Sequence, residues 1–291
     1  MKYDLEFQPE QRQKRDQMTR ILLGFGAILL LLVIASAFAL QKDGFLDRLL
    51  GDYFDPTETE TAPEEDVWAY KGEARFLLCC TDNAVQKLRF CAVAAFDAET
   101  RTIALTPFSA HMKASTGGGG VTLEQALAQG GVKELKTAVE ALLGAPIDRY
   151  IAGSDNQFVK TINDRTANSA GSVPVVLEKS IRYAVGDFTL TLAEGSLRLQ
   201  GDMLLRYFRY LGTLYKGESP PRGQAELLGQ VLETYLTANS GASDAALGKC
   251  FDALVNLLQT DISVTDFYAQ RELILALLAD SGKITITVKG S

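Results

Sequence analysis

The hydrophobic and polar positions divide the chain into an apolar run, an acidic stretch and a long globular part. Residues 21–40 are nearly all apolar and include no charged side chain. Twenty such residues form enough helix to cross a bilayer core of about 30 Å, and a soluble core seldom accepts a helix without a polar face. Residues 52–66 hold seven acidic side chains, two prolines and no basic side chain, which is typical of a stiff linker. The pattern therefore predicts a transmembrane helix followed by a spacer.

The charges before the apolar run predict its orientation. Four basic residues stand just before it, at positions 12, 14, 15 and 20. Positive charge beside a span favours the cytoplasmic side, so we expect the N-terminus inside and everything after residue 40 outside. A cleaved signal peptide is the alternative, because Ala35-Ser36-Ala37 fits the small-residue cleavage pattern.

From about residue 72 the pattern becomes globular, and apolar runs of strand length alternate with helical periodicity. The predicted strands are 74–80, 90–96, 102–106, 147–152, 173–177, 188–192 and 283–288. The run 90–96 lacks alternation, which indicates a central strand that is covered on both faces.

The helical patterns fall between these strands. They cover 132–143, 155–164, 201–210, a segment after Ser219, and 263–279. The first ends at Gly144, and the last begins with a capping box, Ser263 to Asp266, flanked by Ile262 and Phe267 as a hydrophobic staple. Strands interleaved with helices predict an α/β three-layer sandwich with a mixed central sheet.

Composition excludes several kinds of site. The net charge of −7 argues against electrostatic binding of nucleic acid. Four cysteines without metal-ligand spacing and one histidine, His111, make a zinc site improbable. Cys79 and Cys91 lie on successive predicted strands, so a disulfide stays open, although buried free thiols are favoured. The glycines 117–120 lack the Gly-Lys-Ser/Thr of a P-loop and predict a loop.

Short motifs in the globular part resemble those of the LytR–CpsA–Psr family of membrane-anchored bacterial cell-envelope enzymes. Ala141–Tyr150 reads ALLGAPIDRY, similar to the family's LLGIPIDYY. Further segments in the family's order are Asp155–Val159, Ala193–Asp202, Tyr207–Arg209, Arg222–Gln224 and Gln259–Ser263. The resemblance covers about Ala74 to Ala279, and the order and spacing of the motifs make it specific.

The resemblance implies a domain that transfers glycopolymers from a polyprenyl-pyrophosphate carrier to the cell wall. In that family, arginines hold the pyrophosphate, aspartates bind magnesium or move protons, and an apolar cleft takes the lipid. Such a site is physically reasonable, because phosphoryl transfer depends mainly on positioning and charge neutralisation, and arginine binds phosphate in a two-pronged way.

The chain departs from the family pattern at several charged positions. The family's RSDT before the second strand reads Lys87-Leu88-Arg89-Phe90, and its PRD after the third strand reads Pro107-Phe108-Ser109. Two acids and one arginine are therefore replaced. In the YVRFR helix, Arg209 is retained and Leu211 stands at the second arginine. Without the two acids, magnesium binding and proton transfer lose their expected carriers.

The remaining charged residues give the candidate site. Phosphate binding is assigned to Arg209, Arg222, Lys87, Arg89 and Arg206. Arg222 lies in the first turn of a helix, an unfavourable place for a cation, which favours a role in the site over stabilisation. Asp82 is the candidate metal ligand, for Mg²⁺ if the site is active, and a turn aspartate is its alternative reading. His111 is interpreted as a loop histidine, and the catalytic residues are unassigned.

These observations predict four segments: a cytoplasmic tail 1–20, a transmembrane helix 21–40, a juxtamembrane and acidic segment 41–71, and an extracytoplasmic domain 72–291. The predicted function is binding of a polyprenyl-phosphate glycopolymer carrier by an eroded, non-catalytic or regulatory site. Cell-wall polymer and sister enzymes of the family are further candidate partners. The alternatives are an active glycopolymer–peptidoglycan phosphotransferase with an altered residue set, and a receptor-like domain unrelated to polyprenyl lipids.

Overall fold

The structure is a computed structural model. It describes residues 73–82, 87–97, 99–115, 119–154, 156–157, 172–185, 188–238, 240–243, 247–248, 251–252, 255–256 and 258–290. The predicted tail, span and acidic segment, residues 1–71, lie outside these ranges, as does most of the predicted helix 155–164. Within the ranges, no helix has the length and apolarity needed to cross a membrane.

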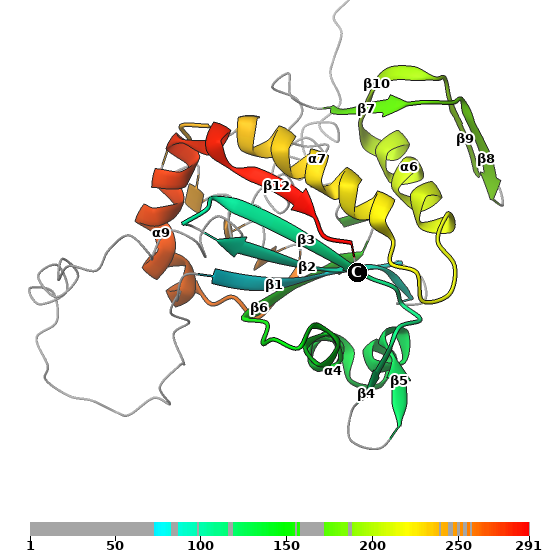
Figure 1. Cartoon of the computed structure of the whole chain (residues 1–291). Helices are drawn as coiled ribbons and strands as arrows, with labels where there is room; N and C mark the ends of the chain where they lie inside the picture. The colour runs from blue at the N-terminus through cyan, green and yellow to red at the C-terminus, as the bar shows by residue number, and fades with distance from the viewer. Residues whose placement is uncertain are drawn as a thin grey trace, which may run out of the picture.

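A six-stranded mixed sheet forms the centre of the domain (Figure 1), in the order β11-β6-β1-β2-β3-β12. Its strands are β1 (Glu73–Thr81), β2 (Leu88–Asp97), β3 (Thr102–Phe108), β6 (Arg149–Ser154), β11 (Gln259–Thr260) and β12 (Thr285–Val288). β1, β2 and β3 pair antiparallel, whereas β6 runs parallel to β1 and β12 runs parallel to β3. The predicted mixed sheet is therefore confirmed, with β2 inside it.

Both faces of this sheet are buried, because alternate side chains of its strands enter two separate cores. Phe76 and Leu78 of β1 belong to one core, and Leu77 and Cys79 belong to the other. The same division explains why β2 is apolar without alternation: a strand covered on both faces gains from an apolar side chain at every position.

Helices cover the two faces and complete three layers (Figure 1). α4 (Leu123–Leu143) lies on one face with the short hairpin of β4 (Lys113–Ser115) and β5 (Gly120–Thr122). α6 (Gly201–Thr213), α7 (Arg222–Ala238) and α9 (Val264–Ala279) lie on the other. A turn of 3₁₀ helix, Ser281–Lys283, leads into β12.

α4 begins earlier than the apolar pattern predicts. A capping box formed by Thr122 and Gln125 starts it, nine residues before Val132. Gly131 has φ 68° and ψ −155°, so the helix is kinked at the point where the sequence pattern seemed to begin. The predicted end is confirmed, because Gly144 adopts the left-handed conformation and donates its N–H to the Glu140 carbonyl.

Two antiparallel ribbons lie beyond α6 (Figure 1). β7 (Val173–Leu177) pairs with β10 (Gly195–Leu199), and β8 (Ile181–Val185) pairs with β9 (Phe188–Leu192). The sequence pattern predicted β7 and β9 and missed their partners. Buried residues of these ribbons, including Val175 and Leu190, join the core under α6 and α7.

The predicted capping box at the start of α9 is present. The Ser263 hydroxyl accepts from the Asp266 N–H at 2.9 Å, and the Asp266 carboxylate accepts from the Ser263 N–H at 2.9 Å. Ile262 and Phe267, the predicted staple, are both buried in the same core. Asp266 also accepts two hydrogen bonds from Arg149 at the start of β6, which fastens α9 to the sheet.

Cys79 and Cys91 lie side by side on neighbouring strands, as partners in the β1–β2 register, and both enter the core beneath α4. With Cys80 they are buried free thiols, as the favoured interpretation predicts. Burial raises the pKa of the Cys79 thiol from 9.0 to about 12, and burial together with the neighbouring Cys79 also raises the pKa of Cys91. Such thiols are structural, because the reactive form is the thiolate. Cys250 lies outside the described residues.

Candidate functional site

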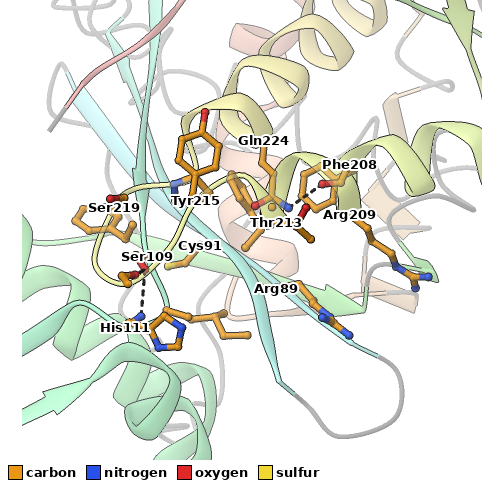
Figure 2. Close-up of a pocket in the computed structure, with 17 residues that line it drawn as sticks. Arg89, Cys91, Ser109, His111, Phe208, Arg209, Thr213, Tyr215, Ser219 and Gln224 are labelled. Carbon is orange, nitrogen blue, oxygen red and sulfur yellow. Dashed lines mark hydrogen bonds between the residues drawn. The ribbon is translucent and has the colours of Figure 1, made fainter. Parts of the chain in front are cut away.

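A pocket of about 180 Å³ opens at the edge of the sheet where β2 begins and β3 ends (Figure 2). The C-terminal half of α6 and the loop between α6 and α7 close it on the other side. Its lining includes Phe90, Phe108, Ala110, Phe208, Gly212 and Thr213. Three segments that are distant in sequence therefore meet here, each at the end of a regular element.

Two predicted phosphate-binding residues, Arg89 and Arg209, line this pocket. Arg89 projects from β2 and Arg209 from α6, and their side chains lie on the same side of the pocket (Figure 2). Two guanidinium groups offer several N–H donors and two positive charges, which suits a phosphate or pyrophosphate group.

Arg89 is held by Asp82, the predicted metal ligand. Its guanidinium lies 3.2 Å from the Asp82 carboxylate, whose side chain is largely buried. Asp82 also accepts the Lys87 N–H and donates its own N–H to the Lys87 carbonyl, so it shapes the end of the β1–β2 hairpin. Asp82 thus restrains the Arg89 side chain and offsets part of its charge.

Metal binding by Asp82 stays a prediction. Over the described ranges, no group of three or more histidine, cysteine, aspartate or glutamate side chains is placed to hold an ion. A magnesium ion at Asp82 would have to share the carboxylate with Arg89, and hard cations usually need further carboxylates or substrate phosphates.

Ser109 stands where the family has an acid, and its hydroxyl makes two hydrogen bonds. It donates to the Gly217 carbonyl at 2.5 Å and accepts the His111 N–H at 3.2 Å. Ser109 is buried, and these bonds tie the end of β3 to the loop between α6 and α7. The position therefore acts as a neutral tether for the pocket wall.

Hydrogen bonds also fix the wall at the start of α7. The Tyr215 hydroxyl accepts the Gly223 N–H at 2.7 Å, which satisfies one N–H of the first helical turn. Gln224 is buried and donates from Nε2 to the Phe208 carbonyl at 3.1 Å, while its Oε1 has no hydrogen-bond partner among the described residues. Phe90 and Phe208 meet edge to face at 5.5 Å and give the pocket an apolar side.

The other three predicted phosphate ligands are placed elsewhere. Arg222 pairs with Glu226 one turn later at 2.8 Å and is more than half exposed. Arg206 donates to the Thr189 carbonyl in β9. Lys87 lies at the hairpin end beside Asp82. None of the three lines the pocket, and their binding of phosphate stays a prediction.

Two departures from the family pattern coincide with core positions. Phe108, which replaces the arginine of PRD, packs in the core beneath α4. Leu211, which replaces the second arginine of YVRFR, packs in the core beneath α6 and α7. Restoring an arginine at position 211 would bury a charge in the core, whereas Phe108 also lines the pocket, so an arginine there would border it.

His111, Tyr215 and Gln224 line the pocket and were not candidate site residues. His111 had been interpreted only as a loop histidine. Gln224 ends the motif Arg222–Gln224, which was the one signal in the sequence that pointed to it. Tyr215 carries no motif, and only the fold brings its hydroxyl to the helix start.

Comparison with solved structures shows the same fold in several bacterial proteins. A Eubacterium siraeum protein described as a transcription regulator matches 81% of this chain and 89% of its own, at 16% identity and TM-score 0.60. Bacillus subtilis TagV matches 76% and 86%, at 20% identity and TM-score 0.54. TagT bound to LI-WTA matches 75% and 78%, at 16% identity and TM-score 0.52.

Comparison of the sequence alone gives a more specific result. No curated protein sequence matches the chain. The model of the LytR_cpsA_psr family matches residues 110–288, more than half of the chain. This chain therefore belongs to the LytR–CpsA–Psr family, as its motifs predicted.

Proposed function

We propose that this protein binds a polyprenyl-phosphate carrier of a cell-wall glycopolymer and that its catalytic site is eroded, so that it regulates envelope assembly or passes on the carrier. In this proposal the predicted span 21–40 anchors it, and the domain that begins near residue 72 works outside the membrane. Cell-wall polymer is a further partner, since TagT, which has the same fold, is described as bound to LI-WTA.

The observation that carries the proposal is the meeting of Arg89 and Arg209 at one pocket. They come from β2 and α6; Arg209 keeps an arginine of the family's YVRFR motif, whereas Arg89 replaces the acid of its RSDT motif and adds a second cation. The start of α7 faces the same pocket through Pro221 and Gln224, and the positive end of a helix dipole also favours an anion. The Phe90–Phe208 pair gives an apolar surface for the first units of a lipid tail.

The proposed loss of catalytic activity is supported by the neutral side chain of Ser109. In the family a carboxylate at this position could act as a general base or metal ligand. The Ser109 hydroxyl instead donates a hydrogen bond to Gly217 and accepts one from His111. The remaining acid of the site, Asp82, is paired with Arg89. Binding by charge-assisted hydrogen bonds needs no acid, but proton transfer does.

The second candidate is an active glycopolymer–peptidoglycan phosphotransferase, favoured by the retained Asp82 and Arg209. It differs in one measurable respect, which is turnover. Magnesium-dependent release of polyprenyl phosphate by the unmodified protein would establish the transferase and refute the eroded site. Binding without turnover supports our proposal.

Calorimetry of the full chain in detergent with a polyprenyl phosphate, and with a polyprenol of the same length, tests the binding. We expect the phosphate to bind more tightly. Arg89→Gln and Arg209→Gln should each cost about 1.5–3 kcal/mol of binding free energy, the scale of a hydrogen bond to a charged group. Affinity for the neutral polyprenol should change little, because the charge contributes only to headgroup binding.

Matched variants separate this role from general damage. Arg198→Gln removes an arginine whose bonds go to Ser172 on the β7–β10 ribbon, and should leave affinity unchanged. Asp82→Asn tests whether the effect of Arg89→Gln comes from an unpaired Asp82. Equal affinity for the phosphate and the alcohol, or no effect of either arginine variant, would contradict the proposal.

A further inference from the structure

α9 exposes apolar side chains and buries polar ones, which is the reverse of an ordinary surface helix. Asp266 and Gln270 are 2% and 1% exposed. Val264 and Tyr268, which lie four residues apart on one side of the helix, are 57% and 62% exposed. A helix at a protein surface normally turns its polar residues to water. The exposed side of α9 therefore has the character of a surface that another group covers.

Tyr268 is the outer end of a row of aromatic rings that begins in the core. Phe251 and Phe267 are buried and stack with ring centres 4.2 Å apart, and Phe267 meets Tyr268 edge to face at 5.4 Å. The Arg271 guanidinium lies 5.9 Å from the centre of the Tyr268 ring, so a positive charge borders the apolar side. Because the inner rings hold Tyr268 in place, little side-chain entropy is lost when another group packs on it.

α9 lies beside the point where the chain enters the domain. Its first turn is fastened to β6, because Asp266 accepts two hydrogen bonds from Arg149. Arg149 is the register partner of Phe76, which comes three residues after β1 begins at Glu73. Figure 1 shows α9 at the end of the sheet where β1 starts. A segment just before Glu73 is therefore tethered beside this helix.

The residues before Glu73 include an apolar segment that differs from the acidic stretch. Val67–Tyr70 reads VWAY and contains the only tryptophan of the chain. Even Val67 is tethered within about 20 Å of Glu73, the length of six extended residues. Residues 64–66, directly before the segment, are all acidic and complement the charge of Arg271. Apolar side chains, acidic neighbours and a short tether together fit the exposed side of α9.

We propose that the segment Val67–Tyr70 docks on the exposed side of α9, with Trp68 packed against Tyr268. The rigid domain then begins at this segment, and the spacer is confined to the acidic stretch 52–66. An anchor at 21–40 is thereby connected to one fixed corner of the domain. This docking does not depend on what the arginine pocket binds.

The single tryptophan makes the contact measurable in the full chain in detergent. We expect Trp68 to emit at shorter wavelength than N-acetyltryptophanamide and to be quenched less by acrylamide, because docking removes its ring from water. Val264→Ser and Tyr268→Ser should each shift the emission to longer wavelength and increase the quenching. Val176→Ser is the matched control, since Val176 is 74% exposed on the β7–β10 ribbon and should leave Trp68 unchanged.

Photo-cross-linking identifies the group that covers α9. Benzoylphenylalanine in place of Tyr268 should cross-link within one chain to the peptide that contains Val67–Tyr70, as read by mass spectrometry. The same replacement of Val176 should give no cross-link to that peptide. A cross-link from position 268 to detergent would assign the helix to a membrane surface, and one to a second chain would assign it to a dimer. Either result overturns the docking.

The reverse substitution gives an independent check. Trp68→Ala should speed hydrogen exchange of the backbone amides in α9 and leave exchange in α7 unchanged, because only α9 loses its cover. Emission that is unchanged in both Val264→Ser and Tyr268→Ser would overturn the proposal even if Trp68 is shielded, since another surface then shields it. Quenching of Trp68 by a brominated detergent, which a docked ring escapes, would place it in the micelle and also overturn the docking.

Discussion

At the scale of single residues, Ser109 explains why the pocket wall depends on a neutral side chain. Its hydroxyl is both donor and acceptor, because Gly217 presents a carbonyl and His111 presents an N–H. An ionised carboxylate at this position could accept from His111 but would face the Gly217 carbonyl without a proton to donate. The loop between α6 and α7 is therefore adapted to the loss of the acid.

Ser109→Asp should destabilise the protein more than Ser109→Ala at pH 7. Alanine loses the hydrogen bond to the exposed Gly217, at a cost of about 0.5–1.5 kcal/mol, whereas aspartate adds a charge at the buried position of Ser109. Urea unfolding measures both. The gap should shrink in acid, where the protonated carboxyl can donate to Gly217. An Asp variant as stable as the parent at pH 7 would show that the loop readily accommodates the family's acid.

The Cys79 and Cys91 thiols make stability depend on alkaline pH. Folding raises the pKa of Cys79 from 9.0 to about 12 and also raises that of Cys91. Above pH 9 the unfolded chain therefore binds fewer protons than the folded one, and the free energy of unfolding falls as pH rises. The stability that protonated Cys79 contributes is fully present below pH 9 and is lost progressively as the pH rises towards 12.

Unfolding measured between pH 8 and 11 should show this slope, with each thiol adding up to about 1.4 kcal/mol per pH unit. Cys79→Ala should reduce the slope as well as the stability at pH 7. Tyr150 and Tyr207, whose pKa values burial also raises, give a background of the same sign that the variant retains. A slope that is identical in Cys79→Ala would mean that this thiol does not titrate with unfolding.

At the scale of elements, α9 is fastened to the sheet by one carboxylate. Asp266 is 2% exposed, accepts two bonds from Arg149 of β6, and completes the capping box with Ser263. A single side chain thus fixes both where α9 begins and where it docks.

Asp266→Ala should lower the free energy of unfolding by about 3–5 kcal/mol, because it removes the buried carboxylate that offsets the charge of the partly buried Arg149. Urea denaturation measures the change. Asp280→Ala is the matched control, since Asp280 pairs with Arg101 and Lys283 at a more exposed site and should cost clearly less. A similar loss in both variants would show that burial of the Arg149 pair has little effect.

Elements with a local signal were predictable from the sequence, whereas those defined by distant partners were not. Phe90–Phe96, Gly144 and Ser263–Asp266 each carry their own signal, and β2, the end of α4 and the start of α9 follow. Thr122 and Gln125 also form a capping box, but the glycines at 130 and 131 hid the helix that continues beyond it. β8 and β10 lacked a strong alternating pattern.

The candidate site was predictable to a similar extent. Arg209 was found because a motif marks it, and Arg89 because it replaces the acid of another motif with a positive charge; the fold brings the two to the same pocket. Arg222 carries a motif too, but Glu226 one turn later pairs with it. The bond between Ser109 and Gly217 joins residues 108 positions apart, and no local pattern contains that information.

At the scale of the whole molecule, all six strands of the described central sheet come from Glu73 and the residues after it. β1, the first described strand, lies between β6 and β2, and β12 near the C-terminus closes the far edge beside β3. Both cores draw on residues after Glu73. The domain thus contains its own core, which is the condition for folding alone.

A truncated chain that starts at Glu65 should remain soluble and unfold in one cooperative transition. The residues removed supply no side chain to either core as described. Calorimetry or circular dichroism on heating measures the transition. A matched truncation that ends at Asp280 removes β12 and should lose that cooperativity. Non-cooperative melting of the first truncation would place the domain boundary earlier.

β1 also separates the pocket from the point where the chain enters the domain. The strand begins at Glu73 and ends at Thr81, and eight steps of a strand span roughly 26 Å. Asp82 and Arg89 lie at its far end. If the chain is anchored before Glu73 and β1 stands perpendicular to the membrane, the arginines lie at least the length of β1 above the lipid headgroups. A domain tilted onto its side would bring the arginines closer to a carrier phosphate at the membrane surface, so tilt would affect access to the pocket.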